Sequence, residues 1–167
     1  MIPAQGPLSD LLSAPLRTGR VVWIGRRPAR RMPMERLEQA MLDPLTGLEG
    51  DHYGNRGTRS RQVTLIGEEA LAAIAAFVGR EAVPPELLRR NIVIAGINPY
   101  ALKAHTVRLG EAVLAVTGEC QPCSRMEEVL GPGGYNAVRG HGGLTARIVT
   151  GGTMRVGDPV ERLGLSE

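Results

Sequence analysis

Residues 61–79 read Arg61-Gln-Val-Thr-Leu-Ile66-Gly-Glu-Glu-Ala-Leu-Ala-Ala-Ile-Ala-Ala-Phe-Val-Gly79, a strand pattern that runs directly into a helix pattern. Polar and apolar residues alternate up to Ile66, as they do in a half-buried strand. Leu71, Ile74 and Val78 then follow at helical spacing, with two glutamates in the first turn and a glycine after the last. This is the one long helix that the sequence predicts, and its apolar stripe is most simply a face buried in the core.

Short β-branched and apolar segments on both sides of this unit predict further strands. The 22 glycines and 12 prolines also indicate many turns. Because repeated βαβ alternation is missing, the pattern favours a closed or strongly curved, largely antiparallel sheet. We therefore predict a mainly β, barrel-like domain with one long helix and a few short ones. The expected strands are Gly19–Gly25, Asn91–Ala95, Thr106–Leu109, Glu111–Val116, Leu144–Val149, Met154–Val156 and Asp158–Leu163, and the paired glycines of Thr150–Thr153 predict a tight hairpin.

The chain length fits one domain, since 17.9 kDa is enough to close a single core. We expect an irregular lead-in over residues 1–18, the domain over 19–163 and a short tail over 164–167. The start of the chain lacks a signal-peptide pattern, and no segment is long and apolar enough to cross a bilayer. These features predict a cytoplasmic protein without a membrane partner, in which thiols stay reduced.

The basic residues are concentrated and chemically uniform. The net charge is +3, and all but one of the 20 basic residues are arginines, half of them within residues 17–61. Codon bias in a GC-rich genome explains the arginines as well as function does, but guanidinium forks also bind phosphate and carboxylate groups. Because the basic segments lack interleaved aromatics and nucleic-acid-binding motifs, a small phosphorylated ligand fits better than nucleic acid.

Cys120-Gln-Pro-Cys123 holds both cysteines of the chain, between a predicted strand and a predicted short helix. A thiol at Cys123 would lie near the positive end of that helix and near Arg125, and both favour the thiolate. Free cysteines are also common as small buried apolar residues. The pairing, the proline and the helix start favour a reactive site.

The predicted helix after Cys123 runs to Leu130. Ser124-Arg-Met-Glu127 has the spacing of a capping box, in which the serine caps the first turn and the glutamate reaches back to the cap amide.

Two kinds of chemistry compete at this cysteine pair. A structural zinc site would need two more ligands from His52, His105 and His141, which are scattered in the sequence and lack H-x₃₋₅-H spacing. A thioredoxin-type dithiol is the stronger alternative, because C-x-P-C before a helix is typical of such redox motifs. The absence of a βαβ unit around the motif argues against it.

Three further clusters combine charged or amide side chains with turn residues. Gly50-Asp-His-Tyr-Gly54 contains Asp51 and His52, Arg89-Arg-Asn91 precedes a predicted strand, and Arg139-Gly-His-Gly-Gly143 contains His141. Each has a plain structural alternative, namely a turn, a solvated helix end and a hairpin loop. The arginines that follow the first cluster, ending at Arg61, make an anion-facing loop the more attractive interpretation.

Taken together, these segments resemble the molybdenum-cofactor sulfurase C-terminal (MOSC) domains over roughly residues 19–163. The resemblance rests on seven segments in order, which together are specific although each is weak. They are Arg27-Pro-Ala-Arg-Arg-Met-Pro-Met34, Gly47-Leu-Glu-Gly-Asp-His-Tyr-Gly54, Arg61-Gln-Val-Thr-Leu-Ile66, Arg89-Arg-Asn-Ile-Val-Ile94, Leu109-Gly-Glu-Ala-Val-Leu114, Pro122-Cys123 and Gly152-Thr-Met-Arg-Val-Gly-Asp158.

The resemblance implies a MOSC-type β-barrel and a site for the molybdenum cofactor, a pterin with a phosphate and a metal-holding dithiolene, without pyridoxal phosphate. The family's cysteine falls on Cys123, which is implied to ligate molybdenum or to carry sulfur as a persulfide. Arg125 would stabilise the thiolate. Cys120 lies outside the family motif and would resolve a persulfide, assist ligation or only fill space. The implied cofactor-binding residues are Asp51, His52, Arg61, Arg89, Asn91 and His141.

The single-domain MOSC proteins that this chain resembles look like two functional kinds. One is sulfur carriers, and the other is molybdenum-dependent reductases of N-hydroxylated compounds. The chain has no flavin, haem or iron–sulfur signature, so a reductase would need a separate electron-donor protein. A sulfur carrier would need a cysteine desulfurase as its partner. The alternatives are a dithiol redox protein and a noncatalytic cofactor-binding module.

Overall fold

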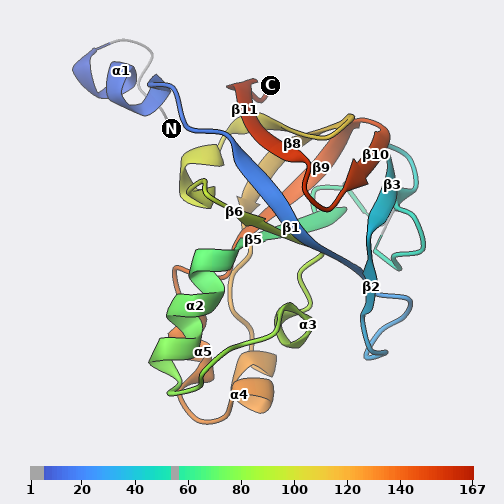
Figure 1. The fold of residues 1–167 in the computed structure, drawn as a ribbon, viewed down its shortest axis with the longest axis vertical. Helices are drawn as coiled ribbons and strands as arrows, with labels where there is room; N and C mark the ends of the chain where they lie inside the picture. The colour runs from blue at the N-terminus through green and yellow to red at the C-terminus, as the bar shows by residue number, and fades with distance from the viewer. Residues whose placement is uncertain (1–5, 54–56) are drawn as a thin grey trace.

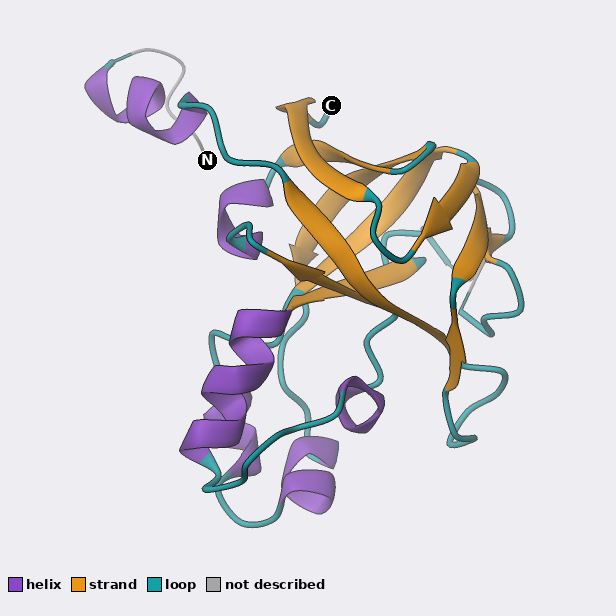
Figure 2. Ribbon diagram, in the orientation of Figure 1, coloured by secondary structure: helices purple, strands orange, loops and turns teal. Residues whose placement is uncertain are grey.

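A strand-rich barrel with a layer of helices at one end forms the body of the protein in the computed structural model, which describes residues 6–53 and 57–167 (Figures 1 and 2). The helical elements are α1 (Pro7–Ser13), α2 (Glu68–Phe77), α3 (Pro85–Leu88), the 3-10 turn η1 (Pro99–Leu102), α4 (Arg125–Leu130) and α5 (Gly134–Val138). The strands are β1 (Gly19–Arg26), β2 (Glu35–Leu37), β3 (Gln39–Asp43), β4 (Gly47–Leu48), β5 (Val63–Gly67), β6 (Ile92–Ala95), β7 (His105–Leu109), β8 (Ala112–Glu119), β9 (Leu144–Thr150), β10 (Gly152–Arg155) and β11 (Pro159–Leu165).

Eight strands form one sheet in the order β11-β7-β8-β9-β5-β6-β1-β2, and β1 also pairs with β11, so that seven of them close into a barrel. All pairings are antiparallel except β5 with β6, which are parallel and joined by a crossover that contains α2 and α3. The sequence-based prediction of a largely antiparallel, barrel-like β domain is therefore confirmed. A second, three-stranded sheet, β10-β3-β4, flanks the barrel.

Two hydrophobic cores share the strands β5 and β6. Leu65, Ile92 and Ile94 point into the barrel, whereas Ile66 and Val93 point outwards to the helices. Successive side chains alternate between the faces of a strand, so a strand covered on both sides is buried throughout, as β5 and β6 are. The helical layer buries the predicted stripe of α2, with Leu71 and Ile74 in the core and Val78 packed against it, and so fixes the helices against one end of the barrel.

The predicted hairpin at Thr150–Thr153 is wrong. β9 pairs with β8 and β5, while β10 pairs with β3 in the other sheet, Met154 lying opposite Ala40. The paired glycines serve a close passage instead, because a Cβ at Gly151 would lie 2.9 Å from the carbonyl oxygen of Leu42 and one at Gly152 would lie 2.6 Å from the Cβ of Glu111. They let the chain leave the barrel for the second sheet.

Several elements were not predicted. Strands β2, β3 and β4 lie in a segment where polar and apolar residues alternate only weakly. Helix α5 is a single short turn with glycines on both sides of it in the sequence. The lead-in expected to be irregular contains α1, which stands away from the barrel (Figure 1) and has no buried residue; residues 1–5 of that lead-in lie outside the described part. Arg162 fixes the end of this helix by donating hydrogen bonds to the carbonyl oxygens of Leu12 and Ala14.

Within residues 6–53 and 57–167, the helices are all too short or too polar to traverse a lipid bilayer.

Candidate functional site

The cysteine loop leaves β8 and enters α4, as the sequence predicts. Cys120 follows directly on β8, its amide donates a hydrogen bond to the carbonyl oxygen of Gly143 (2.8 Å), and its side chain is buried. Cys123 is exposed. The two thiols of the motif are therefore unequal in access, the second being the one that solvent reaches.

The predicted capping box at the start of α4 is wrong. Ser124 has helical dihedral angles and makes no side-chain cap. Glu127 instead accepts hydrogen bonds from the amides of Gly133 (2.9 Å) and Tyr135 (2.8 Å), where the chain enters α5. These bonds lower the pKa of Glu127, first through Tyr135 and then through Gly133. The carboxylate of Glu127 therefore bonds to amides that follow the C-terminal end of α4, not to the amide at its N-terminal end, and joins α4 to α5.

A basic cavity of about 360 Å³ opens beside Cys123. Its lining gathers side chains from the β1–β2 connection, the loop after β4, the end of α3 and the cysteine loop, and its only described acid is Glu128. We call it the basic cavity because seven arginines line it: Arg27, Arg30, Arg31, Arg61, Arg89, Arg90 and Arg125.

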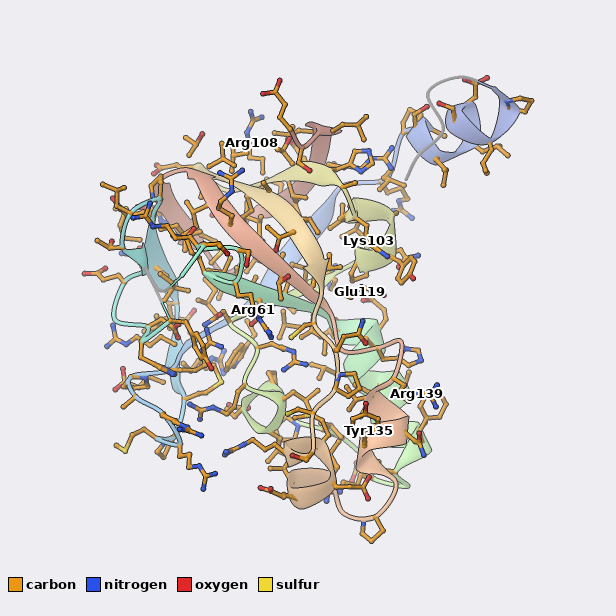
Figure 3. The ribbon with its side chains drawn as sticks, turned by 180° about the vertical axis from the view of Figure 1, so that it is seen from behind. Arg61, Lys103, Arg108, Glu119, Tyr135 and Arg139 are labelled. Carbon is orange, nitrogen blue, oxygen red and sulfur yellow. The ribbon has the colours of Figure 1, made fainter. Side chains whose placement is uncertain are left out.

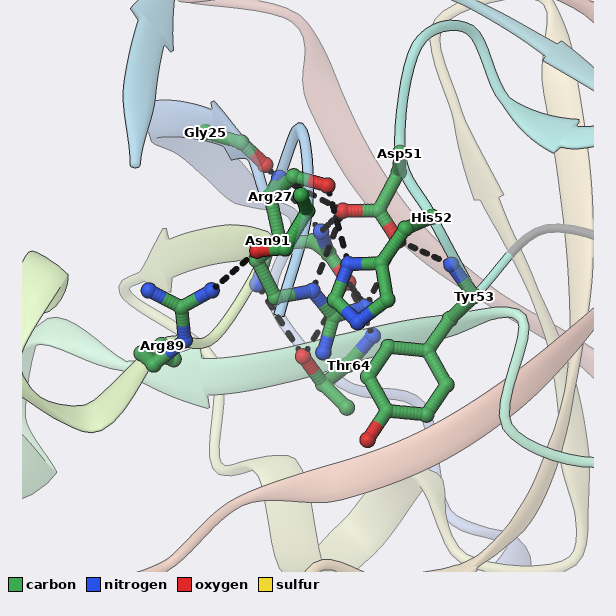
Figure 4. A network of polar contacts seen from close by, with 9 residues as sticks. Gly25, Arg27, Asp51, His52, Tyr53, Thr64, Arg89 and Asn91 are labelled. Carbon is green, nitrogen blue, oxygen red and sulfur yellow. Dashed lines mark hydrogen bonds and ion pairs between the residues drawn. The ribbon is translucent and has the colours of Figure 1, made fainter. Parts of the chain in front are cut away.

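Behind the basic cavity, Arg27, Asp51 and Asn91 form a buried network (Figure 4). The Arg27 guanidinium donates to both carboxylate oxygens of Asp51, at 3.0 and 2.8 Å, and to the Asn91 side-chain oxygen at 2.9 Å. Burial raises the pKa of Asp51, but its bonds with Arg27 outweigh this and the net pKa is lowered. Asn91 also donates to the carbonyl oxygen of Gly25 and to Asp51. Asp51 and Asn91 are thus bonded within the protein and position the cavity wall.

His52 lines the basic cavity with a defined proton position. Its Nδ1 lies 3.0 Å from the carbonyl oxygen of Arg27. Because a carbonyl oxygen only accepts, Nδ1 carries the proton, and in the neutral ring Nε2 is then an acceptor. The Tyr53 ring packs against His52. The guanidinium carbon of Arg27 lies over the Tyr53 ring, 4.5 Å from the ring centroid. The last residue of the predicted Gly50–Gly54 cluster, Gly54, lies outside the described residues.

Arg89 holds the loop that carries Arg30 and Arg31. It is the left-handed C-cap of α3, with a φ of 57°, and its guanidinium donates to the carbonyl oxygens of Met32 and Ala29. Burial and the neighbouring guanidiniums of Arg125 and Arg27 lower the pKa of Arg89. Like charges are thus held close together around the cavity, an arrangement that an anion would relieve.

Arg90 is one of the cavity residues that the sequence-based analysis did not select, as are Arg27, Arg30, Arg31 and Tyr53, although it stands in the Arg89-Arg-Asn91 cluster. Its Nε and Nη1 donate to the carbonyl oxygens of Gly142 (2.8 Å) and Leu88 (2.7 Å), but its buried Nη2 has no partner. Arg125 likewise has a buried Nε without a partner. These are the two unpartnered buried side-chain polar atoms of the described chain, and both belong to guanidiniums that line the basic cavity.

Arg90 lines the same cavity as both thiols. Burial lowers the pKa of Arg90, and Cys120 and Cys123 oppose that shift. The Nη2 of Arg61 reaches the sulfur of Cys120 at 3.9 Å. The structure therefore brings Cys120, Cys123, Arg61, Arg89, Arg125 and His52 to one cavity. His141 is separate from them and lines a second cavity, on the other side of Cys120.

These features define a small β-barrel domain with an arginine-lined cavity beside an exposed thiol. The chain belongs to the MOSC domain family, whose sequence profile matches residues 51–161. No curated protein sequence shows significant similarity to it.

Solved structures share the fold at low sequence identity. The YuaD protein (APC1665) from Bacillus subtilis is similar with a TM-score of 0.77 and 18% identity, over 90% of this chain and 98% of that one. YiiM from Escherichia coli is similar with a TM-score of 0.66 and 18% identity, over 89% and 71%. YiiM from Geobacillus stearothermophilus gives 0.70 and 14%, over 87% and 75%. At such identities these similarities show the fold.

Proposed function

We propose that this MOSC domain protein binds the molybdenum cofactor in the basic cavity and uses Cys123 as its reactive sulfur. The observation that carries the proposal is the pair of unpartnered buried nitrogens, Nη2 of Arg90 and Nε of Arg125, in an arginine-lined wall beside an exposed thiol. A buried N–H group without a hydrogen-bond partner is costly, so a wall that holds two such nitrogens fits an anionic ligand.

The residues present fit a phosphorylated pterin. Arg90 and Arg61 would hold its phosphate, because guanidiniums match phosphate oxygens in a forked geometry. His52 would accept a hydrogen bond at Nε2, and Tyr53 would offer a ring face. The cofactor, when bound, would supply a metal that exchanges electrons and prefers soft sulfur ligands, and Cys123 is the thiol exposed to meet it.

Cys123 has two possible tasks in this proposal. As a sulfur carrier it would hold a persulfide received from a cysteine desulfurase, and as a reductase centre it would ligate the metal while an electron-donor protein supplies electrons. Both suit a reducing cytoplasm. The dithiol alternative is less well supported, because Cys120 is buried and the strands around it, β7, β8 and β9, pair antiparallel rather than in a βαβ unit.

The experiment is metal and pterin analysis of the protein purified from a molybdenum-replete host. We expect both in the wild type, and at least tenfold less pterin in the Arg61→Ala variant, the effect of losing one hydrogen bond to a charged group. Arg108→Ala is the matched control, since Arg108 is an exposed arginine of β7 whose side chain lies well away from Arg61 (Figure 3).

Equal pterin content in Arg61→Ala, Arg108→Ala and the wild type would contradict the binding site. Wild-type protein that is free of pterin and of molybdenum after expression in that host would contradict the proposed function itself.

A further inference from the structure

A second cavity, of about 440 Å³, lies behind the cysteine loop. Its walls come from the start of α2, the turn before η1 and the glycine-rich loop before β9, and they are mostly apolar. We call it the apolar cavity. Cys120 lines both cavities, and Gly142, which lines the apolar one, accepts a hydrogen bond from Arg90 of the basic one. The two cavities therefore stand back to back.

The charge of the apolar cavity is opposite to that of its neighbour. Neither arginine nor lysine lines it in the described chain, whereas Glu69 and Glu119 do. Glu119 is paired with Lys103 at 3.5 Å, so the uncompensated charge is that of Glu69. One oxygen of Glu69 accepts the amide of Gly96 at 2.7 Å. A carboxylate has room for several hydrogen bonds, so Glu69 can also accept one from a ligand.

Small residues keep this cavity open. Ala70 and Ala73 of α2 line the cavity with short side chains, and glycines form much of the opposite wall. A Cβ at Gly142 would lie 2.2 Å from the carbonyl oxygen of Cys120, and one at Gly143 would lie 1.9 Å from that of Leu65. The loop must therefore pass close to β5 and to the cysteine loop, which gives the cavity a fixed back wall. His141 adds a ring that packs against Phe77, with centroids 5.5 Å apart.

We propose that the apolar cavity is a second binding site, for a small ring-containing organic molecule with a neutral or cationic hydrogen-bond donor that meets Glu69. A cavity of this size with apolar walls and few polar groups is typical of small-molecule sites. The carboxylate selects against anions, which the basic cavity attracts. The inference does not depend on the proposed function, because no residue of the cofactor site except Cys120 takes part in it.

The test uses benzylamine, benzyl alcohol and benzoate, which share one ring and differ in charge. Binding to the metal-free protein is followed by the amide signals of selectively ¹⁵N-labelled glycines, since Gly67, Gly96, Gly140, Gly142 and Gly143 all line the apolar cavity. We expect saturable shifts of these signals with benzylamine and benzyl alcohol, and benzoate binding at least about tenfold weaker than benzylamine.

Two variants locate the site. Glu69→Gln keeps an acceptor for the Gly96 amide but removes the charge, so the affinity for benzylamine should fall about tenfold while that for benzyl alcohol stays. Ala73→Trp should fill the cavity and abolish the binding of both probes. Ala72→Trp is its control, since Ala72 is exposed on the same helix and does not line the cavity.

Inorganic phosphate is titrated into each variant to report on the basic cavity. Unchanged amide signals of the glycines that do not line the apolar cavity show that Ala73→Trp is folded, and Ala73→Leu replaces it if these signals are lost. Affinities for all three probes weaker than about 10 mM, equal binding of benzoate and benzylamine, or probe shifts that persist when the cavity is filled would each overturn the proposal. Loss of phosphate binding with intact benzylamine binding would count against the basic site alone.

Discussion

The two cavities on either side of Cys120 are similar in size and opposite in chemistry. The basic cavity collects arginines from segments far apart in the sequence, whereas the apolar cavity is bounded by alanines of α2 and by a glycine-rich loop. The basic wall is held by a buried ion-pair network, and the apolar wall by close backbone passages. The comparison shows that one wall, which includes Cys120, separates a cavity lined by arginines from one that arginine and lysine do not line in the described chain.

The largest expected difference concerns the two thiols. Cys123 lines only the basic cavity, whereas Cys120 lines both cavities. If Cys123 is the reactive sulfur, Cys123→Ser abolishes persulfide formation or reductase activity, and Cys120→Ser leaves much of it. The assays are mass spectrometry after incubation with a cysteine desulfurase and cysteine, and reduction of an N-hydroxylated base with cofactor and an electron donor supplied.

A disulfide cycle gives a different result, because the second thiol must resolve the mixed disulfide. Complete loss in both variants, together with thiol–disulfide exchange by the metal-free wild type, would favour the dithiol alternative over ours.

The ion pair behind the basic cavity gives the next largest effect. Arg27 and Asp51 have side-chain exposures of 8% and 0%, so Asp51→Ala leaves a buried guanidinium unpaired and should lower the free energy of unfolding by about 3–5 kcal/mol. Because the pKa of Asp51 is lowered in the folded protein, its contribution is present above about pH 4 and is lost as the pH falls through the folded value.

Urea unfolding at neutral and acidic pH measures both effects. Glu35→Ala is the control, because it breaks the partly exposed pair with Arg26 and should cost less than about 1 kcal/mol. Similar losses in the two variants would mean that the Arg27–Asp51 pair does not hold the wall.

Arg90 should behave differently from Arg27 although both are buried arginines of the same wall. Arg90→Met removes a cation with an unpartnered nitrogen, so we expect weaker binding of inorganic phosphate, by about 1.5–3 kcal/mol. The free energy of unfolding should change less than in Arg27→Met, which strands a buried carboxylate. Calorimetric titration and urea unfolding of both variants test this contrast, and a larger loss of stability in Arg90→Met would contradict it.

The smallest effect is expected at the junction of α4 and α5. Glu127 is exposed and accepts two backbone hydrogen bonds, which lower its pKa. Its stabilising contribution is therefore present above the unfolded pKa and is lost as the pH falls through the lower folded value. Glu127→Gln should be less stable than the wild type at neutral pH and equal to it in acid. A difference in thermal midpoint that does not change with pH would rule out this role of the charge.

The sequence by itself predicted the local pieces of the site. Alternation and helical spacing located β5 and α2. The short helix after the cysteine loop was predicted in the right place, although the capping box on which that prediction rested is wrong. The segments of the MOSC resemblance placed Arg61 and Arg89, and the structure has both at one cavity. The positions of β5 and α2 could be predicted because the period of a strand or a helix is written in neighbouring residues.

Tertiary structure alone decided which of the selected side chains line the basic cavity and which are bonded within the protein. Asp51 and Asn91 were expected to contact the cofactor but are bonded to Arg27, and His141 lies in the apolar cavity. The pairing of β10 with β3 in the second sheet and the unpartnered Nη2 of Arg90 likewise depend on contacts between segments distant in the sequence. The sequence determined most of the barrel strands, the long helix and the place of the cysteine loop, because their patterns are local. The two cavities were decided only when barrel closure brought distant segments together, because hydrogen bonds between such segments depend on geometry that no local pattern carries.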